Sequence, residues 1–306
     1  MRVVVVFLLS GLLPLACSQE RDPFAWLYGP RSLRFGSLQA DTTGGECPDE
    51  CDCPPSFPVA MYCDGRGLTA MPTIPSRMKY LYLQNNAITA VSDSALVNAT
   101  NLVWLMMHYN QLTSDAIGKK VTPADLEGMD NLTILYLHDN AVTDMGKSLN
   151  TLKSLTLLEI SGNKLTKVPE ALPEHLHQLY LEFNAIDSLP EGFLGQFTQL
   201  QYVRIAHNQL TDKGIPANTF NVTGLVELDL SFNKLERIPS VSTTLQHLYL
   251  QANQIKEFTL GSFCSVVDVT NYSQLRTLRL DGNEISRQDI PNESTLCLRL
   301  TSSIEV

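Results

Sequence analysis

The stretch LVELDLSFNKLERIP, residues 225–239, contains an asparagine where an alternating pattern calls for an apolar residue. Leu225, Leu228 and Leu230 alternate with other residues as in a half-buried strand, and Asn233 follows three positions later. A side-chain amide carried into a core costs roughly 1–3 kcal/mol unless it is hydrogen-bonded. The residue therefore requires a fold that supplies partners for its side chain.

The same pattern, L-x-x-L-x-L-x-x-N-x-L, occurs nine times in the chain. Its asparagines are Asn86, Asn110, Asn140, Asn163, Asn184, Asn208, Asn233, Asn253 and Asn283. Repetition at intervals of 20 to 30 residues is the signature of leucine-rich repeats. Each copy supplies a short strand and a sharp turn whose backbone groups lack ladder partners. An asparagine side chain can satisfy such groups in its own and the neighbouring coil, so we expect a continuous ladder of amides.

The predicted fold is an α/β-type leucine-rich-repeat solenoid shaped as a curved horseshoe. A parallel sheet would line the concave face, and the convex side would be mostly irregular, extended or 3-10 helical. No coil can bury its apolar face alone, so stability must come from stacking, and each exposed end needs a cap.

The first 18 residues have the pattern of a secretory signal peptide. Arg2 precedes the apolar run Val3–Leu9, and small residues precede a cleavage point at Gln19. A signal anchor is the alternative, but a glycine and a proline interrupt the short apolar stretch, which favours removal. We found no later membrane-spanning run and no hydrophobic anchor tail, so we expect a secreted protein without a membrane anchor.

The charge balance is acidic. The chain has 22 basic and 32 acidic side chains, and loss of Arg2 with the signal peptide would lower the net charge from −10 to −11. This balance argues against nucleic acid as a partner and favours cationic or mixed-charge surfaces.

Six cysteines would remain after signal cleavage. Cys47, Cys51, Cys53 and Cys63 precede the first repeat, while Cys264 and Cys297 bracket the last, a placement that suits disulfide caps. An even count in a secreted chain predicts three disulfides, although four clustered cysteines allow three pairings. A metal site in the cluster is the alternative, and it would need a reducing compartment.

Three stretches resemble the class II small leucine-rich repeat proteoglycans. They are CPDECDCPPSFPVAMYCD from Cys47, PSRMKYLYLQNN, and SFCSVVDVTNYSQLRTLRLDGNEI, which lies in a long "ear" coil between Asn253 and Asn283. The resemblance runs from Cys47 to the C-terminus and implies the pairings Cys47–Cys53 and Cys51–Cys63, with Cys264–Cys297 closing the other end.

The resulting organisation has five parts. They are a signal peptide (1–18), a disordered tail (19–46), a cysteine-rich cap (47–75), repeats 1–8 (76–255), and an ear repeat with the C-terminal cap (256–306). Tails in the family carry sulfated tyrosines, whereas this tail has only Tyr28, so a polyanionic tail is not expected. Short coils also recur every third coil in the later part of the array, but this regular spacing is broken between the first and the fifth coil. We infer that two coils are absent near Lys120–Pro123, through either a genuine loss or a misassembled gene sequence.

The resemblance implies a non-enzymatic matrix protein that binds fibrillar collagen, type I first, and regulates fibril assembly. Sequestration of transforming growth factor β is a second implied role, and a receptor ectodomain or ligand trap is the rival within binding proteins. The six dispersed histidines form no catalytic pattern. We expect no cofactor and no metal, although His108 and His138 occupy equivalent positions in adjacent coils.

The expected binding surface is the concave face. Its central outward row would hold Tyr82, Met106, Tyr136, Glu159, Tyr180, Arg204, Asp229, Tyr249 and Arg279. Tyrosine and arginine are enriched in binding hot spots, although tyrosine also suits exposed strand positions generally. The resemblance adds Glu284 as a collagen-binding residue, but Ser286 stands where the family usually has a basic residue.

Five N-x-S/T sequons mark candidate sites for N-linked glycans, which the family can extend into keratan sulfate. Asn98, Asn131, Asn221 and Asn271 each lie just before a strand of the array, while Asn292 lies in the cap loop. The equivalent placement favours the first four.

Overall fold

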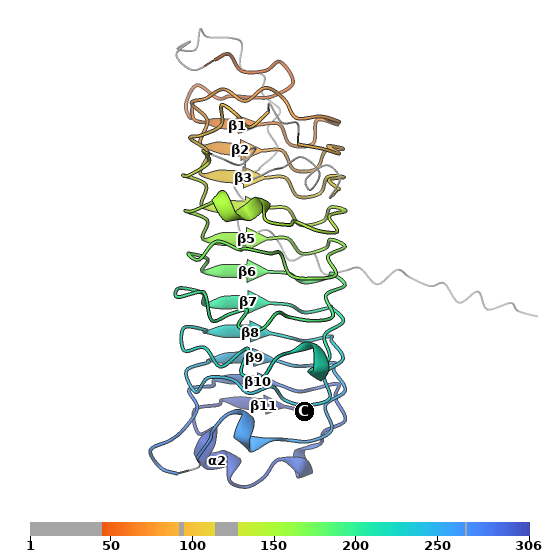
Figure 1. Ribbon diagram of the computed structural model, residues 1–306, viewed down its shortest axis with the longest axis vertical. Coiled ribbons are helices and arrows are strands. Elements are labelled where there is room, and N and C mark those ends of the chain that lie inside the picture. Colours follow the sequence, from red (N-terminus) through yellow and green to blue (C-terminus); the bar gives the residue numbers. More distant parts are fainter. Residues whose placement is uncertain (1–44, 92–94, 114–127, 267) are drawn as a thin grey trace, which may run out of the picture. The chain divides into compact units, whose positions relative to one another are not determined.

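The computed structural model describes residues 45–91, 95–113, 128–266 and 268–306, which belong to one compact unit, Asp41–Val306. Its successive coils each contribute one three-residue strand to a parallel sheet that runs in chain order (Figure 1). The strands are β1 Ala60–Tyr62, β2 Tyr80–Tyr82, β3 Trp104–Met106, β4 Ile134–Tyr136, β5 Leu157–Glu159, β6 Gln178–Tyr180, β7 Tyr202–Arg204, β8 Glu227–Asp229, β9 His247–Tyr249, β10 Thr277–Arg279 and β11 Ser303–Glu305. The predicted leucine-rich-repeat solenoid is confirmed.

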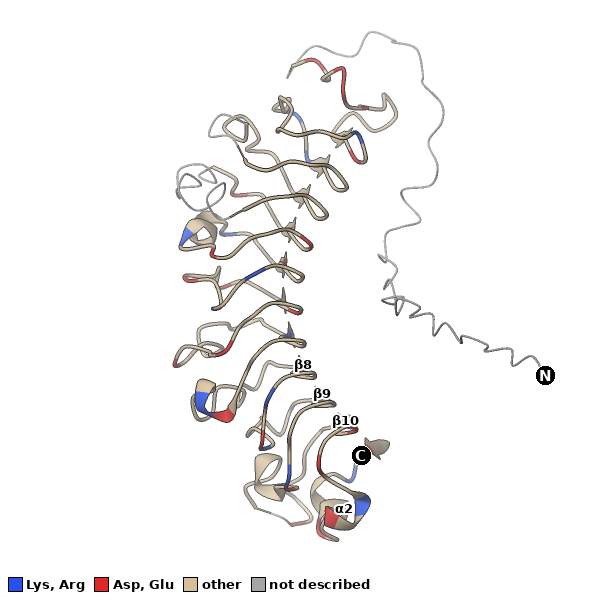
Figure 2. Ribbon diagram, turned by 90° about the vertical axis from the view of Figure 1, so that its right-hand side faces the viewer, with Lys and Arg blue, Asp and Glu red and all other residues tan. Residues whose placement is uncertain are grey.

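The side of the coils opposite the sheet is largely irregular, as expected. Figure 2 shows the strands along the concave side of this unit and the longer loops along the convex side. Short helices interrupt the loops, and they are η2 Ser148–Thr151, η3 Asp212–Gly214, η4 Leu260–Ser262, η5 Arg287–Asp289 and α2 Ser294–Cys297.

The core is a column of leucines and related residues between these two sides. Middle residues of adjacent strands pair in register, for example Val203 with Leu228 and Leu228 with Leu248, and all three are fully buried. Leu225 and Leu230 of the same coil are also buried. Because each coil's apolar residues are covered by the next coil, burial depends on stacking.

The ladder asparagines account for the apparent misfit in each repeat. In the coil quoted first, Asn233 Oδ1 accepts a hydrogen bond from the Leu210 backbone N–H at 3.0 Å. Its Nδ2 donates to the carbonyls of Ile205 in the preceding coil and Leu230 in its own, at 2.9 and 3.0 Å. All nine ladder asparagines repeat this arrangement. The amide therefore joins consecutive coils.

Disulfides lie near both ends of the array. The structure has Cys47–Cys53 and Cys51–Cys63 at the first end and Cys264–Cys297 at the other. The repeat signature predicts nine strands, and the structure has two more among its described residues, β1 and β11, which lie within the cap segments and lack that signature. Each pairs with its neighbour in parallel, β1 with β2 and β11 with β10. The caps therefore extend the sheet by one strand at each end.

The sheet is continuous where the two coils were inferred to be absent. Strands β3 and β4 pair directly, with Trp104 opposite Ile134 and Leu105 opposite Leu135. The inferred position of the loss, 120–123, lies outside the described residues, as do the signal peptide and most of the tail, including Tyr28.

Candidate ligand-binding face

The expected row of side chains lies along the sheet in register. Consecutive partners in the central strands are Tyr136 and Glu159, Tyr180 and Arg204, and Asp229 and Tyr249. Parallel strands lie about 4.8 Å apart, so side chains at the same register position are close neighbours. The row is therefore continuous from β2 to β10.

The N-terminal part of this face is aromatic and tightly packed. Tyr82 stacks on Tyr62 with ring centroids 4.6 Å apart, and Tyr80 meets Trp104 edge-on at 5.1 Å. Tyr82 is only 4% exposed and Met106 is also buried. The structure thus places Tyr82 in the row that the repeat predicts, but with little of its side chain accessible.

The central part of the face carries a mixed-charge cluster. Arg204 Nε donates to Glu227 Oε1 at 2.8 Å, and its guanidinium lies 5.2 Å from the Tyr180 ring centroid. Burial alone would lower the pKa of Arg204. The attraction of the Glu227 carboxylate and its hydrogen bond are together stronger, so the pKa of Arg204 is raised overall. Burial also raises the pKa of Tyr180 to about 12. The arginine stays protonated and the tyrosine stays neutral at physiological pH.

Two carboxylates share Ser161 beside this cluster. The Ser161 backbone N–H donates to Glu159 Oε1 at 3.0 Å, and its hydroxyl donates to Glu182 Oε2 at 3.1 Å. Burial raises the pKa of Glu159 to about 8, and the charge of Glu182 adds to the effect, while the hydrogen bonds from Ser161 oppose it. This part of the face gains negative charge as Glu159 ionises.

The two residues proposed near the C-terminal end lie on a strand and on the loop that follows it. Arg279 is on β10, where it forms ion pairs with Asp281 and Glu305, both at 2.9 Å. Glu284 follows the ladder asparagine of that coil and is exposed on the loop beyond the turn. Ser286, the departure from the family pattern, caps η5 by donating its hydroxyl to Asp289 Oδ2 at 2.7 Å. This role gives Ser286 a structural reason to be a small hydroxyl residue.

An aromatic stack that was not predicted from the sequence lies at the carboxyl edge of the sheet, where the chain leaves the strands. His207 lies between Phe183 and Phe232, with centroid distances of 4.1 and 4.0 Å, and the two phenylalanines are 53% and 45% exposed. All three residues precede a ladder asparagine and have φ of 52–53°. Left-handed backbone is unfavourable for aromatic residues, whereas Asn85 and Gly162 at equivalent positions adopt it readily. The available signal was the residue before each ladder asparagine.

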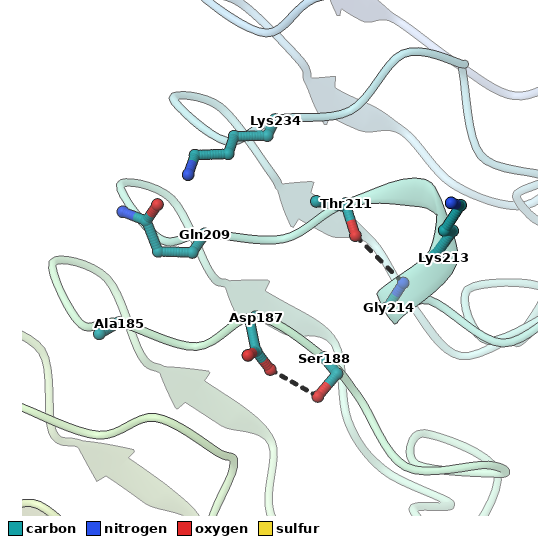
Figure 3. A pocket seen from close by; sticks show the side chains of 8 residues that line it. All are labelled: Ala185, Asp187, Ser188, Gln209, Thr211, Lys213, Gly214 and Lys234. Carbon is teal, nitrogen blue, oxygen red and sulfur yellow. Dashed lines mark hydrogen bonds between the residues drawn. The ribbon is translucent and has the colours of Figure 1, made fainter.

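An open depression of about 640 Å³ is lined in part by the residues two positions after each stacked ring, Ala185, Gln209 and Lys234. Figure 3 shows Ala185, Gln209 and Lys234 on three successive loops, with Lys213 on η3 across from them. Asp187 and Ser188 also line the depression, and Asp187 accepts a hydrogen bond from the Ser188 hydroxyl at 2.7 Å. Within the described part of the chain, neither lysine has an ion-pair partner.

The sequon asparagines are all exposed, including Asn292. Asn98, Asn221 and Asn271 each lie four residues before the first leucine of their repeat, whereas Asn131 immediately precedes its leucine. The Asn131 amide also donates to the Thr100 carbonyl of the preceding coil at 3.1 Å. Three of the sites thus share one place in the coil, and the fourth is displaced toward the strand.

The two histidines in equivalent positions do come together. Their rings stack with centroids 4.3 Å apart, and burial lowers the pKa of His108 to about 3, with the charge of His138 adding to the effect. His138 Nδ1 is within 2.8 Å of Asp139 Oδ2. Among the described residues, no cluster of three or more His, Cys, Asp or Glu side chains is arranged to hold a metal ion. No helix in the described ranges has the length and apolarity needed to cross a membrane.

Comparisons with known sequences identify close relatives. The family described as Leucine Rich repeat matches residues 198–217. Fibromodulin from Bos taurus is 47% identical over 302 residues, covering 85% of this chain and 80% of its own length. Lumican from Gallus gallus is 41% identical over 322 residues, covering 91% of this chain and 94% of its own length.

Lumican from Bos taurus is 36% identical over 347 aligned positions, covering 100% of this chain and 100% of its own length. The absence of two coils near Lys120–Pro123 stays a prediction.

Solved structures support the same architecture. A chain in the octameric complex of Latrophilin 3, Unc5D and FLRT2 matches with a TM-score of 0.68 and 27% identity, covering 84% of this chain and 83% of that chain. A leucine-rich-repeat protein from Leptospira interrogans matches with a TM-score of 0.57 and 24% identity over 76% of this chain and 63% of its own. The second likeness concerns the fold alone.

Proposed function

Since this chain belongs to the class II small leucine-rich repeat proteoglycans, which are secreted structural proteins of the extracellular matrix, we propose that it binds fibrillar collagen and regulates fibril assembly. Type I collagen is the first partner to test. The family membership confirms two sequence-based expectations, a location in the matrix and the absence of enzymatic activity. The collagen-binding role goes beyond that membership and is argued from the concave face.

The observation that carries the proposal is the row of partly exposed aromatic and charged side chains from β4 to β10. Seven strands spaced about 4.8 Å apart span about 29 Å. A polyproline-type chain rises about 3.1 Å per residue, so such a surface matches roughly 9 residues of each collagen strand. This contact length allows several collagen side chains to be engaged at once.

The chemistry of the row suits a partner with both imino rings and charged side chains. Tyr180 and Tyr249 offer apolar ring surface with a polar hydroxyl, a combination common in binding hot spots. Glu227 and Asp229 can pair with basic side chains of a partner. The ion pair between Arg204 and Glu227 pre-positions both groups on the face, which lowers the entropic cost of binding.

The proposed glycans lie at the amino edge of the sheet, where the strands begin. The loops that follow the strands lie at the opposite, carboxyl edge. Their attachment points precede the strands, at Asn98, Asn131, Asn221 and Asn271, with Asn292 a further sequon in the cap. N-linked chains there, extended or not into keratan sulfate, would project from the amino edge and leave the concave face accessible. They would hold neighbouring fibrils apart while the face contacts collagen.

A fibril-assembly assay tests the proposal. Purified secreted protein is added to acid-soluble type I collagen, turbidity is followed, and fibril diameters are measured by electron microscopy. We expect delayed assembly and thinner fibrils. Unchanged kinetics and diameters at saturating protein would overturn the collagen-binding proposal.

Charge reversal at Glu284 tests the residue that the resemblance implicates. Glu284→Lys should weaken collagen binding, with Glu257→Lys as a matched control because Glu257 is an exposed acidic residue on another loop. Equal binding by both variants would remove Glu284 from the site while leaving the concave face as the candidate.

A further inference from the structure

The ear coil exposes two valines close in sequence to one glycosylation sequon. Val266 is 56% exposed and Val269 is 71% exposed, although apolar side chains usually gain by burial. A hollow of about 180 Å³ is lined mainly by the same loop. It is lined by Thr243, Cys264, Ser265, Val266, Thr270, Asn271 and Tyr272. The sequon asparagine is thus part of the wall of the hollow.

The asparagine is held in place by a carboxylate within its own loop. Asp268 Oδ1 accepts from the backbone N–H and the hydroxyl of Thr270, both at 2.6 Å, and from the Asn271 backbone N–H at 2.8 Å. Asp268 Oδ2 accepts from Asn271 Nδ2. These hydrogen bonds hold the pKa of Asp268 well below its ordinary range, so the anchor remains charged at physiological pH. The attachment atom therefore has a fixed position at the hollow.

The loop is also connected to the C-terminal cap. Ser273 donates its backbone N–H to the Cys297 carbonyl at 2.8 Å, next to the Cys264–Cys297 disulfide. Arg299 donates from Nη1 to the Val269 carbonyl at 3.1 Å, and its guanidinium lies 3.5 Å from the centroid of the Tyr272 ring. Anything that orders this loop will therefore also stabilise the cap.

We propose that the first N-acetylglucosamine of a glycan on Asn271 occupies this hollow, packs over Val266 and Val269, and completes the C-terminal cap. The inference rests on the proposed glycosylation and adds a structural role to it. A pyranose ring has an apolar C–H face and its acetamido group has a methyl, so it can cover valine side chains while its hydroxyls face water. The attachment makes the contact intramolecular, which gives the sugar a high effective concentration at the two valines.

The test compares three forms of a protein in which the other four sequon asparagines are replaced by glutamine. The first carries a high-mannose glycan on Asn271, the second is trimmed by endoglycosidase H to a single N-acetylglucosamine, and the third is Asn271→Gln. Mass spectrometry first establishes occupancy of Asn271. Hydrogen exchange of the segments 260–275 and 294–302 and the melting temperature are then measured.

We expect the trimmed form to match the full glycoform, and Asn271→Gln to exchange faster in both segments with a Tm lower by about 2–4 °C. When Val266→Ser and Val269→Ser are also present, the trimmed form and Asn271→Gln should differ less in hydrogen exchange and in Tm. Asn221→Gln, made in a protein that keeps only the Asn221 sequon, serves as the control and should leave both cap segments unchanged.

Two results would overturn the inference, and they differ in meaning. An unoccupied Asn271 would refute the glycosylation on which it rests. Full occupancy with equal hydrogen exchange in the trimmed and Asn271→Gln forms would refute only the structural role. The structural role would also be refuted if the two forms differed just as much in exchange and Tm when both valines are replaced by serine.

Discussion

Removing one rung of the amide ladder tests how the coils are held together. Asn208 is buried in the middle of the array and its side chain contacts four backbone groups. Oδ1 accepts from the Ile186 N–H at 2.9 Å, and Nδ2 donates to the carbonyls of Leu181, Ile205 and Ala206 at 2.9, 3.2 and 3.0 Å. Asn208→Ala deletes all of these contacts.

The loss in the free energy of unfolding depends on which backbone groups lose their only hydrogen-bond partner. The Leu181 carbonyl keeps the amide of Asn184, the Ile205 carbonyl keeps that of Asn233, and the Ala206 carbonyl keeps the Phe183 N–H. The Ile186 N–H alone is left without a replacement. An orphaned buried donor costs about 1–3 kcal/mol and each lost bond to a retained acceptor about 0.5–1 kcal/mol. We therefore expect a loss of about 2.5–6 kcal/mol in the free energy of unfolding.

Urea unfolding followed by circular dichroism measures this loss, with Asn150→Ala as the control because Asn150 is exposed on η2. Hydrogen exchange at Ile186 localises the effect. Asn208→Asp should be worse than Asn208→Ala at pH 7, because it keeps the acceptor but turns a carboxylate toward three carbonyls, and it should recover as acid neutralises it. A cost within about 0.5 kcal/mol of the Asn150→Ala control would refute the ladder as a source of stability.

Two further predictions concern backbone packing and pH. A Cβ at Gly214 would lie 2.1 Å from the Asp187 carbonyl oxygen, so Gly214→Ala should lower the free energy of unfolding by about 1–3 kcal/mol, whereas Gly261→Ala, which meets nothing within 4 Å, should be nearly neutral in the same urea titration. Burial raises the pKa of Glu159 from 4.5 to about 8, so its contribution to stability is full below pH 4.5 and is lost as pH rises through 8. Glu159→Gln should therefore become more stable relative to the wild type between pH 5 and pH 8, and a pH-independent difference would contradict this.

The repeating part of the fold could be predicted from the sequence because it is encoded locally. Each repeat contains its own strand, turn and ladder asparagine, so one coil, such as that of Asn233, predicts the geometry of the others. Strands β1 and β11 could not be predicted in this way. Their residues carry no repeat signature and become strands only because the adjacent coil offers unpaired backbone groups. Short strands of this kind depend on a neighbour and leave little local signal.

The candidate site, too, could be predicted from the sequence only in part. The pattern predicted which residues share a row, but the tertiary structure decided what surrounds each member. Tyr82 is buried against Tyr62 of an unpredicted strand, and Arg279 is paired with Glu305 of another. The aromatic stack around His207 depends on three coils at once.

The sequence by itself determined the number of repeats, the ladder, the row of candidate binding residues and the family resemblance, because a period of one coil repeats the same local interactions. Only the tertiary structure decided the exposure of Tyr82, the pairing of Arg279, the hollow beside Asn271 and its ties to the cap. Those features arise where segments of unequal length and without periodicity meet. The contacts there depend on distances between coils, which no local pattern in the chain encodes.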